Sequence, residues 1–307
     1  MDDQVITVEH LHKQYGEQVA VEDVTLDVRR GEIFGIAGPN GAGKTTSVEC
    51  IQGLRKPDRG QIRVLGMDPV HDGTKLRQRI GSQLQQSALP DRLRVWEALD
   101  LFASFVPGES DWPGLIEQWG LAGKERTAFA NLSGGQQQRL FIALALINDP
   151  EIVFLDELTQ GLDPAARRVT WGLIRAARDH GKTIVLVTHF MDEAEILCDR
   201  LAIIDRGQVI DLDSPQALIN RHGGPQKVTF STEENDLAWL ESLNVVHSVS
   251  RLGSQVSVTG TGPLVPLVSH ALVGNGIVPG DLRVHQPSLE DTFLRLTGRE
   301  QMNGMAD

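Results

Sequence analysis

The sequence has no apolar run long enough to form a membrane-spanning helix. Such a helix needs about 20 consecutive apolar residues, whereas the longest apolar stretches here are short segments such as 140–147 and 184–187. The first ten residues, MDDQVITVEH, include acids at the start and lack the apolar core of a secretory signal peptide. These absences predict a cytosolic protein that does not itself cross a membrane.

Cysteines and basic residues are also scarce. The two cysteines, Cys50 and Cys198, lie in apolar helical patterns without C-x-x-C spacing, so we expect reduced core residues and no metal or redox role. The chain has 29 basic and 41 acidic residues, and its formal net charge is -12. Because binding to nucleic-acid phosphates requires a positively charged surface, the excess of acidic over basic residues predicts no nucleic-acid partner.

The chain has enough length and apolar content for a sizeable core. Hydrophobic residues make up 40% and charged residues 23% of its 307 residues, which is ordinary for a globular protein. This length suggests two domains. Turn residues cluster at His222-Gly223-Gly224-Pro225, so we expect domains over residues 1–222 and 225–307.

The N-terminal part alternates between strand-like and helical patterns. Residues 5–10 and 19–28 predict a small antiparallel sheet. A mostly helical pattern from Leu76 to Ala130 predicts an inserted helical subdomain. Apolar runs typical of buried parallel strands occur at 33–37, 152–155 and 183–187. Together these patterns predict an α/β domain with a mainly parallel central sheet.

The C-terminal part predicts a different, smaller fold. Expected strands lie at 227–231, 245–251, 255–259 and 281–285, and expected helices at 236–243 and 263–273. The order βαββαβ predicts a small ferredoxin-like α+β domain. A final helix is expected to begin at Ser288, because Ser288 and Asp291 stand at capping-box spacing. No catalytic motif marks this part, which suggests regulation or assembly.

The strongest motif is GPNGAGKTT, from Gly38 to Thr46. It fits the phosphate-binding loop G-x-x-x-x-G-K-[ST], and it follows a strand-like run and precedes a helix-forming one. Its glycines let the backbone wrap around a polyphosphate, Lys44 adds a charge for the β and γ phosphates, and Thr45 can hold Mg²⁺. The alternative is a glycine-rich turn that matches the motif by chance. It is disfavoured because a strand-like segment precedes the motif and a helix-forming segment follows it. The candidate nucleotide-binding residues are Gly38, Pro39, Asn40, Gly41, Ala42, Gly43, Lys44, Thr45 and Thr46.

Further motifs occur in a fixed order around this loop. Tyr15 precedes it, the sequence LSGGQ at 132–136 opens a helix, one apolar strand ends in Asp156-Glu157, and another is followed by His189. Over residues 5–219 this order resembles the nucleotide-binding subunit of an ABC transporter. The resemblance implies a P-loop NTPase fold, with ATP and Mg²⁺ as cofactors.

The resemblance gives the two adjacent acids different roles. Asp156 is implied in the Mg²⁺ shell, and Glu157 is implied as the base that orients or polarises the attacking water. His189 resembles the histidine that touches the γ-phosphate; a lone histidine would otherwise be structural. The alternative for the acids is a solvated pair at the end of a strand.

The family's glutamine loop corresponds to the turn 83–86. We place the glutamine that senses Mg²⁺ and water at Gln85, with Gln83 and Gln86 as alternatives. Tyr15 matches the aromatic that stacks on adenine, which favours ATP. The alternative interpretation of Tyr15 is an exposed aromatic residue in a loop.

The LSGGQ motif combines a hydroxyl, glycines and a helix N-terminus, which together suit an anion. In the family this array closes on the γ-phosphate of the opposite subunit, which implies a homodimer in the ATP-bound state. The chain departs from the family in the next loop, where Leu158 and Gln160 replace a common proline and a threonine or serine. Because proline fixes φ, leucine is expected to leave the turn looser. The residues carried over are Ser133, Gly134, Gly135, Gln136 and Asp163.

The segment 288–298 resembles the C-terminal extension of ABC-2 type, drug-resistance-like exporter ATPases. This implies an ATPase on the inner face of the cell membrane that energises separate transmembrane permease subunits, with a drug, antibiotic or lipid-like substrate. One alternative is a soluble ABC ATPase acting on the ribosome or nucleic acid. Such proteins usually carry two cassettes or a long coiled coil, and neither is present. A binding module that has lost hydrolysis is disfavoured by Lys44, Asp156, Glu157 and His189.

Overall fold

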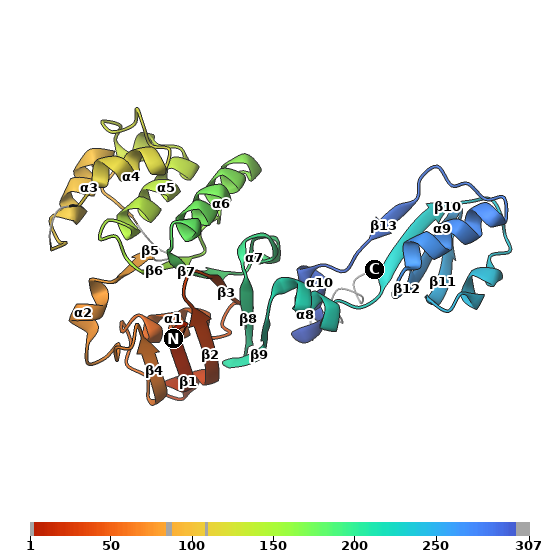
Figure 1. Cartoon of the computed structure of the whole chain (residues 1–307), viewed down its shortest axis with the longest axis horizontal. Helices are drawn as coiled ribbons and strands as arrows, with labels where there is room; N and C mark the ends of the chain where they lie inside the picture. Colours follow the sequence, from red (N-terminus) through yellow and green to blue (C-terminus); the bar gives the residue numbers. More distant parts are fainter. Residues whose placement is uncertain (1–2, 84–87, 108–109, 299–307) are drawn as a thin grey trace. The chain divides into compact units, whose positions relative to one another are not determined.

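The computed structural model describes residues 3–83, 88–107 and 110–298. The chain divides into two compact units, Met1–Pro215 and Gln216–Asp307 (Figure 1). This division groups most of helix α8 (Pro215–His222) with the C-terminal unit. The domain limits predicted from the sequence, 1–222 and 225–307, differ in the placement of this helix and remain a prediction.

A nine-stranded sheet organises the N-terminal unit, in the order β4-β1-β2-β9-β8-β3-β7-β6-β5. Its strands β1, β2 and β4 pair in antiparallel fashion, as the sequence predicted, and the pairing of Asp23 of β2 with Gln208 of β9 joins them to the rest of the sheet. The strands are β1 (Gln4–Tyr15), β2 (Gln18–Arg29), β3 (Ile33–Ala37), β4 (Arg59–Val64), β5 (Ile80–Gln83), β6 (Ile152–Asp156), β7 (Thr183–Thr188), β8 (Arg200–Asp205) and β9 (Gln208–Asp213).

The centre of this sheet is parallel and fully buried. Every residue of β3, β6 and β7 is buried, and β7 pairs in parallel with both of the others. Continuous apolar strands are typical of parallel sheets covered on both faces. This confirms the predicted α/β class.

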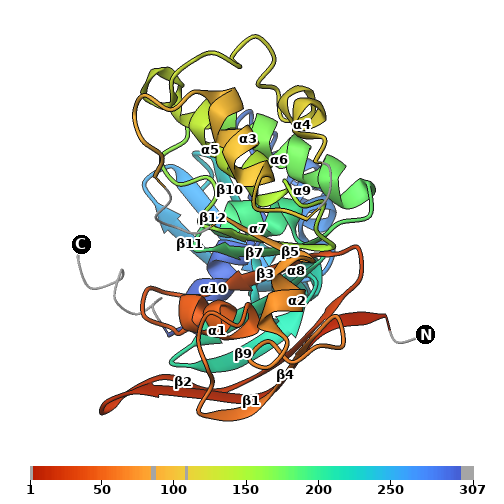
Figure 2. The same cartoon turned by 90° about the vertical axis from the view of Figure 1, so that its left-hand side faces the viewer.

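The helices of the unit gather mainly at one end of the sheet. Helices α3 to α6 lie beside β5, β6 and β7, whereas β1, β2 and β4 lie at the opposite end (Figures 1 and 2). The helices are α1 (Lys44–Ile51), α2 (Gly73–Arg77), α3 (Val95–Ala103), α4 (Trp112–Gln118), α5 (Gly134–Ala145), α6 (Pro164–Asp179) and α7 (Met191–Leu197), with a 3₁₀ turn at Phe129–Asn131.

The mostly helical pattern predicted for 76–130 is interrupted by strand β5. This short strand forms because it pairs in parallel with the buried strand β6. Gly81 within it packs so closely that a Cβ would lie 1.8 Å from the carbonyl oxygen of Ala145. Tertiary pairing thus overrides the local pattern.

Both cysteines are buried and free. Burial raises the pKa of Cys50 to about 11 and raises the pKa of Cys198 well above its usual range. Neither thiol is set up as a nucleophile, because the reactive form is the thiolate. The prediction of two reduced core residues is confirmed.

The C-terminal unit holds a four-stranded antiparallel sheet in the order β11-β12-β10-β13. The predicted helix at 236–243 is only a 3₁₀ helix, Ala238–Ser242. The capping box of α10 is confirmed, since the Ser288 and Asp291 side chains each accept the other's backbone N–H. The regular elements are β10 (Gln226–Ser231), β11 (Val246–Leu252), β12 (Gln255–Gly260), α9 (Leu264–Gly274), β13 (Arg283–His285) and α10 (Leu289–Leu296).

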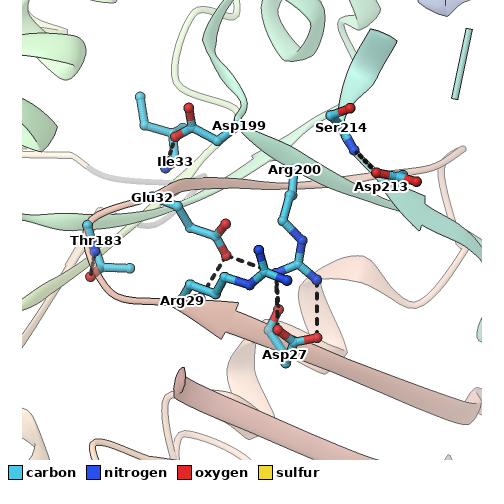
Figure 3. Close-up of polar contacts among 10 residues, drawn as sticks. Asp27, Arg29, Glu32, Ile33, Thr183, Asp199, Arg200, Asp213 and Ser214 are labelled. Carbon is cyan, nitrogen blue, oxygen red and sulfur yellow. Dashed lines mark hydrogen bonds and ion pairs between the residues drawn. The ribbon is translucent and has the colours of Figure 1, made fainter. Parts of the chain in front are cut away.

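A partly buried polar cluster fixes the start of β3, the strand that leads into the phosphate-binding loop (Figure 3). Both terminal nitrogens of Arg200 lie 3.1 Å from the carboxylate of Asp27, and one also lies 3.3 Å from Glu32. The Asp199 carboxylate accepts the backbone N–H of Ile33 at 2.8 Å. Burial raises the pKa of Glu32. The guanidinium therefore offsets the cost of placing two acids beside a buried strand.

Replacing Arg200 by methionine should destabilise the N-terminal unit by about 3 kcal/mol, because it leaves Glu32 buried without its cation. Chemical denaturation of the nucleotide-free protein measures this. The exposed Arg92 provides the control Arg92→Met. If both variants unfold at the same denaturant concentration, the cluster does not hold β3 in place.

Candidate active site

The loop between β3 and α1 adopts a conformation that its glycines permit. Gly41 and Gly43 have φ values of 80° and 98°. A Cβ on Gly38 would lie 2.1 Å from the carbonyl oxygen of Ile204, so only glycine fits there. The amide groups of the loop lead directly into the N-terminus of α1, which favours an anion.

Lys44 is the first residue of α1 and is only 6% exposed. Its Nζ donates hydrogen bonds to the carbonyl oxygens of Gly38, at 2.8 Å, and Pro39, at 3.0 Å. Burial lowers the pKa of Lys44, and the nearby acids Glu157 and Asp156 oppose this effect. The ammonium is thus held over the loop, within the electrostatic reach of both acids.

In-register pairing brings the ends of three strands to one edge of the sheet. Ala37 at the end of β3 pairs with Thr188 of β7, and Asp156 at the end of β6 pairs with Val187 of the same strand. The phosphate-binding loop, the acid pair and His189 follow these residues directly. This edge, at the carboxyl ends of parallel strands, is where α/β sheets bind ligands.

Asp156 is 8% exposed, and its surroundings disfavour the charged form of its carboxyl group. Its pKa is raised from 3.8 to about 6, first by burial and then by the charge of Glu157, against the opposing effect of Lys44. A cation bound here would relieve this cost. The exposed hydroxyl-bearing Thr45 lies beside Lys44 at the start of α1.

These residues fit a magnesium site that is completed by phosphate oxygens. Mg²⁺ is usually held by one or two carboxylates together with waters and substrate phosphates. Among the described residues, no group of three or more His, Cys, Asp and Glu side chains could hold a metal without such help. Asp156 and Thr45 therefore match the kind of site in which nucleotide and metal bind together.

Glu157 differs from its neighbour in backbone and partner. Its φ is 48°, in the left-handed region, and its N–H donates to the carbonyl oxygen of Val187 at 2.9 Å. Its Oε1 lies 3.1 Å from Nδ1 of His189, whose ring packs on Phe190 at 4.1 Å between centroids. Strained backbone of this kind is stored where a side chain must be aimed. The two acids thus have separate environments, as expected.

Tyr15 is 41% exposed and is flanked by cations. Its ring centroid lies 5.3 Å from Nζ of Lys13 and 6.0 Å from the guanidinium carbon of Arg55. Asp58 holds this end of β1 by accepting from Lys13 Nζ at 2.9 Å and from the N–H of Gln14 at 2.7 Å. Sequence reasoning missed these neighbours, because nothing local links Asp58 to the tyrosine.

The LSGGQ residues form the N-terminus of α5. Ser133 is the N-cap: its Oγ accepts the N–H of Gln136 at 3.4 Å, and the Gln136 side chain accepts the N–H of Ser133 at 3.0 Å. Ser133 and Gly134 are exposed. The motif therefore combines a helix cap with an exposed helix N-terminus.

Asp163 caps α6, because its Oδ1 accepts the N–H groups of Ala165 and Ala166, both at 2.9 Å. An aspartate directly before a proline at the first helical position is a typical start of a helix. The preceding turn is anchored by the fully buried Leu158 and by a 3.2 Å backbone bond from Gln160 to Glu157. Burial of leucine thus restrains the turn that was expected to be looser without proline.

The glutamine loop is described only in part. Gln83 is the last residue of β5, where it is buried and pairs with Leu155 of β6. The preferred glutamine, Gln85, and the alternative Gln86 lie outside the described residues.

Comparisons with known proteins agree with this geometry. The family profile described as "ABC transporter" matches residues 21–160. The Nod factor export ATP-binding protein I of Ralstonia nicotianae is 39% identical over 96% of this chain and 94% of its own length. The daunorubicin resistance ATP-binding protein DrrA3 of Streptomyces coeruleorubidus is 35% identical over 98% of both chains.

The chain belongs to the family of ABC transporter ATP-binding subunits. This ABC subunit is an ATPase with the P-loop NTPase fold. The alternative of a soluble ABC ATPase acting on ribosomes finds no support among these relatives.

Solved structures of ABC cassettes match the larger part of the chain. The structure of an ATP-binding subunit of an ABC transporter is 28% identical, with a TM-score of 0.64, over 71% of this chain and 93% of its own. A bacterial ABC transporter cassette solved as a dimer is 29% identical, with a TM-score of 0.60, over 68% and 98%. Within the described residues of this ABC subunit, no helix has the length and apolarity to cross a bilayer.

Replacing Asp156 by asparagine should stabilise the nucleotide-free ABC subunit. The folded-state pKa of Asp156, about 6, exceeds the ordinary value of 3.8. Its stability contribution is therefore full below the ordinary pKa and is lost as the pH rises through the folded pKa. At about pH 8 the variant should gain up to roughly 3 kcal/mol in unfolding free energy, and the gain should shrink toward about pH 4.

Denaturation at several pH values measures this gain. The exposed Asp100 on α3 provides the control Asp100→Asn. Equal, pH-independent effects of the two substitutions would contradict the raised pKa of Asp156.

Proposed function

We propose that this ATPase powers a multi-subunit exporter whose membrane-spanning permease is formed by separate chains. The observation that carries the proposal is the full-length similarity, C-terminal unit included, to proteins named for Nod factor export and daunorubicin resistance. The proposed substrate is a drug, antibiotic or lipid-like compound. The subunit then works at the inner face of the cell membrane, bound to its permease.

Coexpression with candidate permeases tests the export function. Cells with both chains should lower the accumulation of a transported compound, and a Lys44→Ala version should not. A permease that never copurifies with the wild-type subunit would contradict the proposal.

The phosphate groups of ATP are proposed to replace carbonyl partners of Lys44. The ammonium now donates to Gly38 and Pro39, and a β or γ phosphate offers it charged acceptors in their place. The amides from Gly38 to Thr46 and the N-terminus of α1 hold the remaining oxygens. Tyr15 supplies an aromatic face for adenine, with Lys13 and Arg55 beside it.

Asp156 and Thr45, with Gln85 from the glutamine loop, are the residues proposed to hold Mg²⁺. When bound, the metal neutralises charge on the phosphates and so favours their displacement. The protein contributes a buried carboxylate whose charge is unfavourable without a cation.

Glu157 is proposed to accept the proton of the attacking water or to orient that water. The left-handed backbone turns its carboxylate to His189, and the imidazole fixes one carboxylate oxygen at 3.1 Å. His189 is proposed also to contact the γ-phosphate with its remaining ring nitrogen.

Replacing Glu157 by glutamine should leave ATP binding intact and lower hydrolysis by ~10² or more, because the amide keeps the shape but cannot accept the proton. Phosphate release and equilibrium binding of a nucleotide measure the two effects. Glu117→Gln on the exposed side of α4 is the matched control. Turnover within a few-fold of wild type would show that Glu157 is not the base.

The exposed N-terminus of α5 is proposed to complete the site of a second subunit. Ser133 and Gly134 offer a hydroxyl and backbone amides at a helix N-terminus, an arrangement that suits a γ-phosphate. The solved dimer of a related cassette supports pairing of two copies. Two ATP molecules would then lie between two head-to-tail subunits.

A mixture of two inactive variants tests this pairing. Ser133→Arg should abolish turnover and spare ATP binding, while Lys44→Ala should fail to use ATP. In their heterodimer one composite site carries both defects and the other carries none, so turnover should partly return. Ser133→Ala controls for the lost helix cap, which costs about 1 kcal/mol. Full activity of Ser133→Arg alone would exclude the composite site.

A further inference from the structure

The sheet of the C-terminal unit has two chemically different faces. Residues that alternate inward, among them Val228, Phe230, Val256 and Val258, are buried in a core with α9 (Figure 1). Because side chains alternate along a strand, the residues between them lie on the other face. That face is polar, and most of its side chains are exposed.

A hollow of about 530 Å³ lies on this polar face. Its size falls within the range of small-molecule sites. Four of the residues that line it are cationic or can become so: Lys227, Arg251, Arg283 and His285. Three others carry hydroxyl groups: Thr229, Ser250 and Ser257.

Strand register places these groups side by side. Lys227 of β10 is directly opposite His285 of β13, and Thr229 is opposite Arg283. On the other side of β10, Thr229 is opposite Ser257 of β12, which is in turn opposite Ser250 of β11. Directly opposite residues have Cβ atoms about 5 Å apart. Lys227 and Arg283 are diagonal neighbours across β10 and β13, at a separation of about 7–8 Å that their long side chains can span to reach one small anion.

The acids and the fourth cation nearby have other partners. Asp281 accepts from the N–H of Ser231 at 2.9 Å and from its Oγ at 2.6 Å, and these bonds lower its pKa. Arg251 donates to the carbonyl oxygens of Thr232, Glu234 and Gly253. No carboxylate is among the described residues that line the hollow. The charge of Arg283 also contributes to the lowered pKa of Asp281, so Arg283 is partly balanced by that carboxylate, whereas no acid lines the hollow beside Lys227.

We propose that this hollow binds a small molecule carrying a phosphate monoester or diphosphate group. Lys227 and Arg283 supply two full charges, which match a doubly charged phosphate better than a single carboxylate, and His285 supplies a further N–H donor. The hydroxyls of Thr229, Ser250 and Ser257 complete the hydrogen bonding. Symmetric pairing of this face with the same face of a second copy is disfavoured, because it would bring the same cations against each other.

The site is independent of the ATP site and of the export function. Every residue that holds the proposed phosphate lies in the C-terminal unit, whereas all the nucleotide motifs lie in the N-terminal unit. Binding of such a ligand gives this unit a sensory role that the ATPase motifs do not supply.

Histidine-selective NMR of the full chain tests the site, with pyrophosphate as the probe. The label is ¹³C at the histidine ring, and sodium chloride keeps the ionic strength constant. The His285 signal should shift and saturate, while that of His270, exposed on α9 at the other face, should not move. His189 reports separately on pyrophosphate at the ATP site. Substitution of each histidine by glutamine assigns the signals.

Lys227→Gln and Arg283→Gln should each weaken the pyrophosphate affinity read at His285 by about tenfold or more, since each removes a charged hydrogen-bond donor. Lys124→Gln, an exposed site in the other unit, should leave it unchanged. Saturation that survives both hollow variants would overturn the proposal. The proposal would also be overturned if chloride alone shifted the His285 signal to the same extent. A shift of the His285 signal that appeared only with anionic lipid vesicles would overturn it as well.

Discussion

The in-register pairing of β3, β7 and β6 is the constraint on which the rest of the ATPase depends. Parallel strands can end together only if each pairs without a slip, and a slip of one residue would turn every side chain to the opposite face. Here all three strands are buried on both faces, and β7 pairs with both of the others over five consecutive residues. The register therefore fixes where the phosphate-binding loop, the acids and His189 begin.

The site places groups together that would be more stable apart. Asp156 is a buried carboxylate beside Glu157, Lys44 is a buried ammonium that donates only to carbonyl oxygens, and Glu157 adopts a left-handed backbone. Each of these lowers the stability of the nucleotide-free fold. The buried core around the site offsets that cost, together with the ion pairs that Arg200 forms with Asp27 and Glu32 at the start of β3.

Sequence patterns predicted the parts of the fold that local chemistry decides. The glycine loop requires positive φ values and close backbone approach, so its sequence is nearly sufficient to define it. Apolar runs located β3, β6 and β7, and the Ser288 capping box located α10. Strand β5 was missed because four residues containing Gly81 have little strand preference without β6 beside them.

Sequence patterns predicted the site residues that lie in continuous motifs. They did not predict that Asp58 lies near Tyr15, because only the pairing of β1 with β4 brings the segments that carry these two residues together. The contact between Glu157 and His189 likewise depends on the neighbouring ends of β6 and β7. The role of Gln85 stays a prediction, since it lies outside the described residues.

In both units side chains alternate between the two faces of the sheet, but polar side chains become accessible at different places. In the central sheet both faces are covered, so polar groups can act only where the strands end, and that edge carries the ATP chemistry. In the C-terminal sheet α9 covers one face, and most alternate residues along β10, β12 and β13 are at least partly exposed on the other, whereas Thr229 is buried. A cation opposite another cation contributes nothing to such a sheet by itself, since like charges directly across two strands are destabilising. Lys227 and Arg283, two cations at diagonal positions on neighbouring strands, are therefore explained better by an anion between them than by the stability of the sheet.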